Sequence, residues 1–129
     1  MEARPFLMFE GQAEAAMTLY TSIFPDGKVL QVERYAAGQP GPEGTIKVAR
    51  FSVAGLTLAC SDSFVQHGFT FTPSVSIFVD FNDEDVLRRV YDQLSDNGQT
   101  HMPLADYGFS RLFAWVQDRF GVSWQLNLL

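Results

Sequence analysis

Apolar and polar residues alternate along several short stretches of this chain, most clearly at residues 112–129, LFAWVQDRFGVSWQLNLL. The turn-forming residues from Asp118 to Gly121 separate two β-rich runs, which predicts a hairpin. In its second arm, four apolar residues alternate with three polar ones: Val122, Trp124, Leu126 and Leu128 against Ser123, Gln125 and Asn127. This pattern predicts a strand with one apolar face. The other face carries amides and a hydroxyl without charge, which favours the wall of a small-molecule cavity. An ordinary half-exposed strand is the alternative, and composition alone favours it.

Patterns elsewhere in the chain predict six more strands and two helices. The apolar stripe from Gly11 to Phe24 predicts a helix that Pro25-Asp26-Gly27 ends, and a second helix runs from Asp83 to Asn97. The remaining predicted strands cover residues 4–10, 28–36, 45–53, 56–61, 74–81 and 99–104. Residues 63–73 read as a connector, so one domain over 1–129 is expected, with unit one at 1–62 and unit two at 74–129.

The two halves of the chain repeat the same order of elements. An offset of 71 residues places Tyr20 on Tyr91, and it places Phe6 and Met8 on Ile77 and Val79. An offset of 66 residues superposes the two hairpins, with Leu56, Leu58 and Cys60 falling on Val122, Trp124 and Leu126. The repeat predicts an α+β fold of tandem β-α-β-β-β units, with eight strands and two main helices. The alternative is a chance similarity of two α+β halves.

Composition and charge narrow the classes of partner. The chain of 129 residues carries a net charge of −6 and has no cluster of Lys and Arg, so nucleic acid is not an expected partner. A single Cys precludes an intramolecular disulfide and fits a reducing cytosol. The N-terminal stretch contains no long apolar run, so neither a secretory signal nor a membrane partner is expected. The predicted localisation is cytoplasmic.

Four motifs resemble one known family: PFLMFEGQAEAAMTLYTSIFPDGKV, ERYAAGQPGPEGTI, FTFTPSVSIFVD and MPLADYGFSRLFAWVQDRFGVSWQLNL. Together they cover nearly the whole chain and are similar to the PhnB-like branch of the vicinal oxygen chelate superfamily, which includes glyoxalase, bleomycin-resistance and extradiol dioxygenase proteins. That branch is often labelled a demethylubiquinone 3-methyltransferase domain. The resemblance implies sheets that curl into a cup around a ligand site, and a homodimer.

The resemblance also indicates where a metal would be held. Metalloenzymes of the superfamily carry a ligand on the first and last strand of each unit, which here implies Pro5 or Leu7, Ser74 or Ser76, Ala59 and Gln125. None of these is a His, a Cys or a carboxylate, so no metal and no other cofactor is expected. His67 and His101 are expected to be hydrogen-bonded surface or core residues. No Gly-rich turn for S-adenosylmethionine occurs, so methyl transfer is not expected.

The predicted ligand-binding residues are those of the face opposite the helices: Ser61, Ser76, Phe78, Trp115, Gln125 and Asn127. Leu7 and Phe9, with Ala59, Phe113 and Ser123, are assigned to the same face. Aromatic walls with a few amides and hydroxyls suit a small planar or apolar organic molecule. The alternative for the aromatic residues is that they fill the cup or a dimer seam.

Two functions from different classes remain open. The first is a homodimer that binds a small organic ligand without catalysis. The second is an isomerase, lyase or oxygenase of the superfamily, with a metal recruited by Gln125 and Asp62 or His67, or with acid–base catalysis by Asp62, Asp106, Tyr35 or Tyr107. Turn or loop roles are the alternative for the two Asp residues, and packing is the alternative for the two Tyr residues. No nucleophile with an adjacent base is visible, and Cys60, in phase with Leu58, is expected to be a buried structural thiol.

Overall fold

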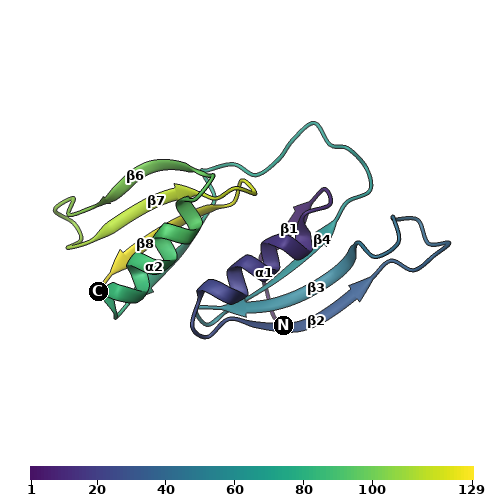
Figure 1. Ribbon diagram of the computed structural model, residues 1–129, viewed down its shortest axis with the longest axis horizontal. Coiled ribbons are helices and arrows are strands. Elements are labelled where there is room, and N and C mark those ends of the chain that lie inside the picture. Colours follow the sequence, from purple (N-terminus) through teal and green to yellow (C-terminus); the bar gives the residue numbers. More distant parts are fainter. The chain divides into compact units, whose positions relative to one another are not determined.

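The computed structural model describes residues 1–129 and contains the predicted tandem β-α-β-β-β units (Figure 1). The elements are β1 (Phe6–Phe9), α1 (Ala13–Ile23), β2 (Lys28–Arg34), β3 (Ile46–Val53), β4 (Leu56–Asp62), β5 (Ser76–Phe81), α2 (Glu84–Ser95), β6 (Gln99–Ala105), β7 (Phe113–Gln117) and β8 (Ser123–Leu128). The chain divides into two compact units, 1–68 and 69–129, with the boundary inside the predicted connector. Neither helix is long and apolar enough to cross a membrane.

In unit 1, the helix α1 lies against one face of a four-stranded sheet of order β1-β4-β3-β2. The strands β1 and β4 are parallel, and the other pairs are antiparallel. The helix buries an apolar stripe that ends in Tyr20, whose ring lies 6.0 Å from that of Phe51 on β3. Since alternate residues of a strand point to opposite faces, Ala49, Phe51 and Val53 are buried under the helix while Arg50 is exposed on the other face.

Unit 2 has the same topology, with a sheet of order β5-β8-β7-β6 and α2 on one face. The helix buries Leu87, Val90 and Leu94. Beneath it, Trp124 on β8 is fully buried and donates its indole N–H to Asp118 at 2.9 Å. The buried Asp118 also accepts the backbone N–H groups of Phe120 and Val122, and so holds the turn between β7 and β8.

The offset of 71 residues predicted for the first strands is wrong. Leu7 pairs with Cys60 on β4, whereas Val79 pairs with Leu126 on β8, so β1 and β5 correspond with an offset of 72. The reason is that three residues connect β1 to α1 but only two connect β5 to α2. A slip of one residue exchanges the two faces of a strand.

This correction moves two residues of the predicted site. Leu7 and Phe9 were predicted on the face opposite the helix, but they are buried, and they neighbour Cys60 and Asp62 on the helix-covered face. Their places on the other face belong to Phe6, which is 56% exposed, and to Met8.

One buried carboxylate connects three elements of unit 1. Asp62, at the end of β4, accepts the backbone N–H groups of Gly11 and Ala13 with Oδ1, both at 2.9 Å, and that of Ile46 with Oδ2 at 3.0 Å. Gln12, the residue before α1, makes no side-chain cap, so Asp62 accepts the N–H of Ala13, the first residue of the helix, from a distant part of the chain. Asp62 therefore has a structural role, and both of its oxygens are engaged.

The thiol of Cys60 lies two residues before this carboxylate and is inaccessible to solvent. Burial raises the pKa of the Cys60 thiol to about 11, and the nearby charge of Asp62 adds to the rise. Because the thiolate is the reactive form, this supports the prediction of a structural thiol.

We predict that Asp62→Asn lowers the free energy of unfolding by about 2 kcal/mol, because the amide nitrogen would face the N–H of Ile46 and leave a buried donor unpaired. The matched control is Asp83→Asn. Asp83 caps α2 with one oxygen only, and asparagine caps a helix equally well. Urea denaturation of both variants provides the measurement, and equal losses would contradict the role given to Asp62.

A second prediction concerns the pH dependence of stability. The Cys60 thiol is neutral in the folded chain up to a pKa of about 11, whereas an unfolded cysteine releases its proton near pH 8.5. The contribution of Cys60 is therefore fully present below the unfolded pKa and is lost as the pH rises through the folded pKa. The free energy of unfolding should fall more steeply across this window in the wild-type chain than in Cys60→Ala. Parallel curves would show that the thiol does not titrate differently in the two states.

Candidate functional site

The face of the unit 2 sheet opposite α2, called here the open face of unit 2, carries five of the six predicted ligand-binding residues. Strand pairing aligns them in three rows across the sheet. The rows are Ser76, Ser123, Gln117 and Gln99; then Phe78, Gln125, Trp115 and Met102; then Asp80, Asn127, Phe113 and Ala105. The structure thus brings Ser76, Phe78, Trp115, Gln125 and Asn127 onto one surface.

Neighbouring side chains hold the polar groups of this face in fixed orientations. Gln125 donates its amide N–H to the Ser76 hydroxyl at 2.7 Å, and Asn127 donates to the Asp80 carboxylate at 2.8 Å. The Trp115 indole N–H donates to Ser123 at 2.8 Å. These bonds use the Trp115 indole N–H and one of the two N–H groups of each amide, and they leave oxygens, such as Oε1 of Gln125, without a partner in the chain. The face therefore offers amide and carboxylate oxygens to a ligand as hydrogen-bond acceptors.

Aromatic rings surround these acceptors. Phe78 is 54% exposed and lies 6.3 Å from the ring of Phe113. Phe113 in turn contacts Phe109 edge-on at 5.0 Å, and Phe109 is 68% exposed. At the other end of the face, the ring of His101 lies 4.9 Å from that of Trp115, and its Nε2 is 3.3 Å from Oε1 of Gln117. This combination of accessible rings and fixed polar atoms is typical of a surface that binds planar molecules.

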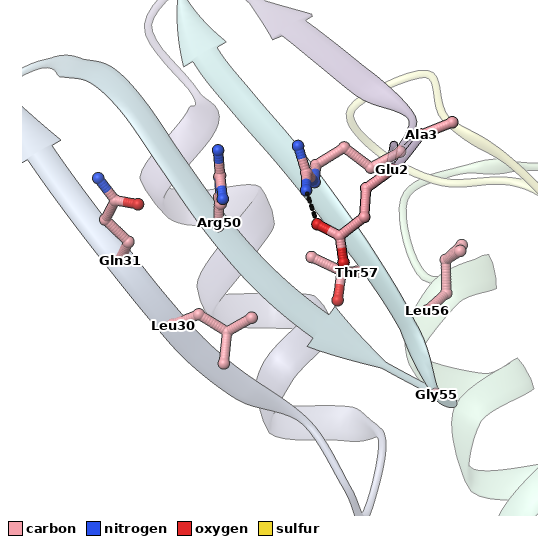
Figure 2. Close-up of a pocket in the computed structure, with 9 residues that line it drawn as sticks. Glu2, Ala3, Leu30, Gln31, Arg50, Gly55, Leu56 and Thr57 are labelled. Atoms are coloured by element: carbon pink, nitrogen blue, oxygen red, sulfur yellow. Dashed lines mark hydrogen bonds and ion pairs between the residues drawn. The ribbon is translucent and has the colours of Figure 1, made fainter.

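The sixth predicted residue, Ser61, lies on the corresponding open face of unit 1, the face opposite α1, where it pairs with Met8. That face also contains a hollow of about 480 Å³ (Figure 2). Gln31, Arg50 and Thr57 project into it from neighbouring strands. Its other lining residues are Glu2, Ala3, Arg4, Leu30, Gly55 and Leu56.

The two arginines of this hollow were missed in the reading of the sequence. Arg50 lies between the buried residues Ala49 and Phe51 of β3, so the alternation of the strand places it on the open face. This charged residue between apolar neighbours was the signal by which the sequence could have indicated it. No pattern connects Arg4 to Arg50, because they meet only through the pairing of β1, β4 and β3.

The other candidates from the sequence have local structural roles. Asp106 accepts the backbone N–H of Gly108 at 2.8 Å, as in a tight turn. The hydroxyl of Tyr107 donates to the carbonyl of Pro103, and the ring of Tyr35 meets that of Phe64 edge-on at 6.0 Å. Nε2 of His67 lies 2.8 Å from the Ser63 hydroxyl.

The residues in the positions implied for a metal do not suit a divalent cation. With the corrected register, the first strands present Phe6, Met8, Ser76 and Phe78 on the open faces, and the last strands present Ala59, Ser61 and Gln125. Divalent ions need several carboxylate, imidazole or thiolate donors in one shell. Nowhere in the chain do three or more His, Cys, Asp or Glu side chains form such a group.

The helix N-termini, which often bind the anionic part of a nucleotide-like cofactor, are already occupied by carboxylates of the chain. At α1, Asp62 accepts the N–H groups of Gly11 and Ala13. At α2, Asp83 accepts those of Asp85 and Val86. At each terminus a carboxylate of the chain thus lies where an anionic group of a ligand would bind.

Comparisons with known proteins agree with this fold. Residues 1–127 match the family model of 3-demethylubiquinone-9 3-methyltransferase. A solved structure of a putative 3-demethylubiquinone-9 3-methyltransferase, PhnB protein, from Bacillus cereus is 43% identical, covers 100% of both chains and has a TM-score of 0.96. Protein YjdN of Escherichia coli K12 is 22% identical over 142 residues, which are 100% of this chain and 96% of that protein.

A more distant structure shows the fold alone. A glyoxylase/bleomycin resistance protein/dioxygenase domain from Frankia sp. EAN1pec is 14% identical, covers 99% of this chain and 96% of its own, and has a TM-score of 0.68. The chain therefore belongs to the PhnB-like 3-demethylubiquinone-9 3-methyltransferase family, and it shares its fold with a glyoxylase/bleomycin resistance protein/dioxygenase domain.

Proposed function

We propose that this protein binds a small planar aromatic molecule on the open face of unit 2, with Phe78, Trp115 and Gln125 as its main contacts. The observation that carries the proposal is the middle row of that face. There, an exposed phenyl ring, an amide and an indole ring lie side by side on three paired strands. Stacking on aromatic rings and hydrogen bonding to a fixed amide are sufficient to bind such a molecule.

The orientation of the polar groups narrows the class of ligand. The indole N–H of Trp115 and one of the two amide N–H groups of Gln125 are engaged by serine hydroxyls, which fixes the orientation of both side chains. The oxygen of Gln125 and the carboxylate of Asp80 remain as acceptors. A ligand with a hydroxyl or amino group on its ring complements this face, because each such group donates to one of these oxygens.

We propose that this activity requires no methyl donor and no resident metal. Two features support this: the helix N-termini are filled by Asp62 and Asp83, and the strand positions implied for a metal carry Ser, Gln, Ala and apolar residues. The family description names a methyltransferase, and we treat it as a family name and not as the activity of this chain.

A homodimer is part of the proposal. Each unit leaves large apolar side chains exposed, including Phe64 at 53% in unit 1 and Phe69 at 67% in unit 2. Apolar side chains of this size favour burial against a second surface. A second copy of the chain is the partner that the family resemblance implies.

Native mass spectrometry of freshly purified protein tests both the binding of an aromatic molecule and the homodimer. We expect a mass of two chains that retains a small aromatic compound. Trp115→Ala and Gln125→Ala should each lower retention at least about tenfold, through lost stacking and a lost hydrogen bond, and should leave the dimer intact. Trp115→Phe, which preserves an aromatic ring, should retain most of the compound.

The matched control is Gln93→Ala, since Gln93 is an exposed amide on α2 and lies outside the open face. Retention unchanged in both Trp115→Ala and Gln125→Ala would remove these residues from the site. A monomeric mass at micromolar concentration would contradict the dimer.

A further inference from the structure

We propose that the hollow on the open face of unit 1 is a second binding site, for the carboxylate group of a small organic acid. Its residues all belong to unit 1, whereas those of the proposed aromatic site belong to unit 2. Its recognition groups are the guanidinium groups of Arg4 and Arg50, and Thr57 also lines it.

The pairing of the strands explains why the two guanidinium groups share one hollow. Phe6, Ala59, Arg50 and Gln31 form one row across β1, β4, β3 and β2. Thr57 lies on the same face of β4 as Ala59, two residues earlier, and Arg4 lies two residues before Phe6. The hollow therefore lies over the short side chains of β4, and Arg50 and Thr57 are both directed into it (Figure 2).

Both guanidinium groups have unused hydrogen-bonding capacity. Arg50 makes no hydrogen bond or ion pair within the chain and is exposed. Arg4 donates to Glu2 from Nη2 at 3.0 Å, and this is the one hydrogen bond its guanidinium makes in the chain. Carboxylates accept two parallel hydrogen bonds from a guanidinium, which makes them the natural complement.

Charge and shape favour a carboxylate over a phosphate. Arg4 and Arg50 against Glu2 leave a net charge of one positive unit among the lining residues. The carboxylate of Asp26, which contacts the lining residue Gly55, is bonded to the N–H groups of Ala54 and Gly55. Leu30 and Leu56 add apolar walls, which suit the carbon body of an organic acid and not a fully polar anion.

Solution NMR of the full chain tests this site, with benzoate as the probe at constant ionic strength. Benzamide is the uncharged isostere, and inorganic phosphate is the anion without an apolar body. We expect benzoate to shift the amide signals of Gln31 and Thr57 and the Nε–H signals of Arg4 and Arg50 in a saturable manner. Benzamide and phosphate should each bind at least about tenfold more weakly, since one lacks the charge and the other the apolar contact.

Substitutions of the two arginines test whether they are the groups that bind benzoate. Arg50→Gln and Arg4→Gln should each weaken benzoate binding at least about tenfold. Arg89→Gln should leave it unchanged, because Arg89 is an exposed arginine on α2 with no hydrogen bond. The proposal is overturned by the absence of a saturable shift, by benzamide or phosphate binding as tightly as benzoate, or by unchanged binding in Arg50→Gln. None of these results bears on the aromatic site, whose residues belong to unit 2.

Discussion

A single helix covers one face of each four-stranded sheet, and the rest of the structure depends on this constraint. One set of alternate residues on β3, β4, β7 and β8 points toward the helix of its own unit, where Phe51 and Trp124 are fully buried. The other set points to the other face, which no element of the same unit covers. Folding therefore constrains the helix-facing residues, and it leaves the residues of the open face available for binding.

The two open faces show what different residues do on the same scaffold. In unit 2, the middle row carries Phe78, Gln125 and Trp115, which suit a neutral ring with donor groups. In unit 1, the corresponding strands carry Arg50, Ala59 and Phe6, which suit an anion above a short side chain. Buried carboxylates stabilise both scaffolds, because Asp62 and Asp118 each accept several N–H groups that would otherwise be unpaired.

Much of the fold follows from periodicity that the sequence displays directly. The final hairpin, the two helices and the repeated order of elements all depend on local alternation or on turn residues such as Gly121, whose φ of 94° suits glycine. The placement of Gln125 and Trp115 on one face follows from the same alternation, and the pairing of β7 with β8 bears it out.

Other features depend on contacts between residues far apart in the sequence, so local patterns do not reveal them. The face of Leu7 depends on the length of the connection before α1, which differs by one residue between the two units. Asp62 reads as an isolated turn residue, and its role appears only when Gly11 and Ile46 lie beside it. The proximity of Arg4 and Arg50 likewise requires the order β1-β4-β3.

The most direct test of the division between covered and open faces is chemical-shift mapping of unit 2 with phenol, a small ring that carries a donor. Changes should alternate along the strands: the side chains of Phe78, Trp115 and Gln125 should shift, and those of Val79, Val116 and Leu126 should not. Shifts that are largest among the helix-facing residues, or that show no alternation, would contradict the assignment of binding to the open face.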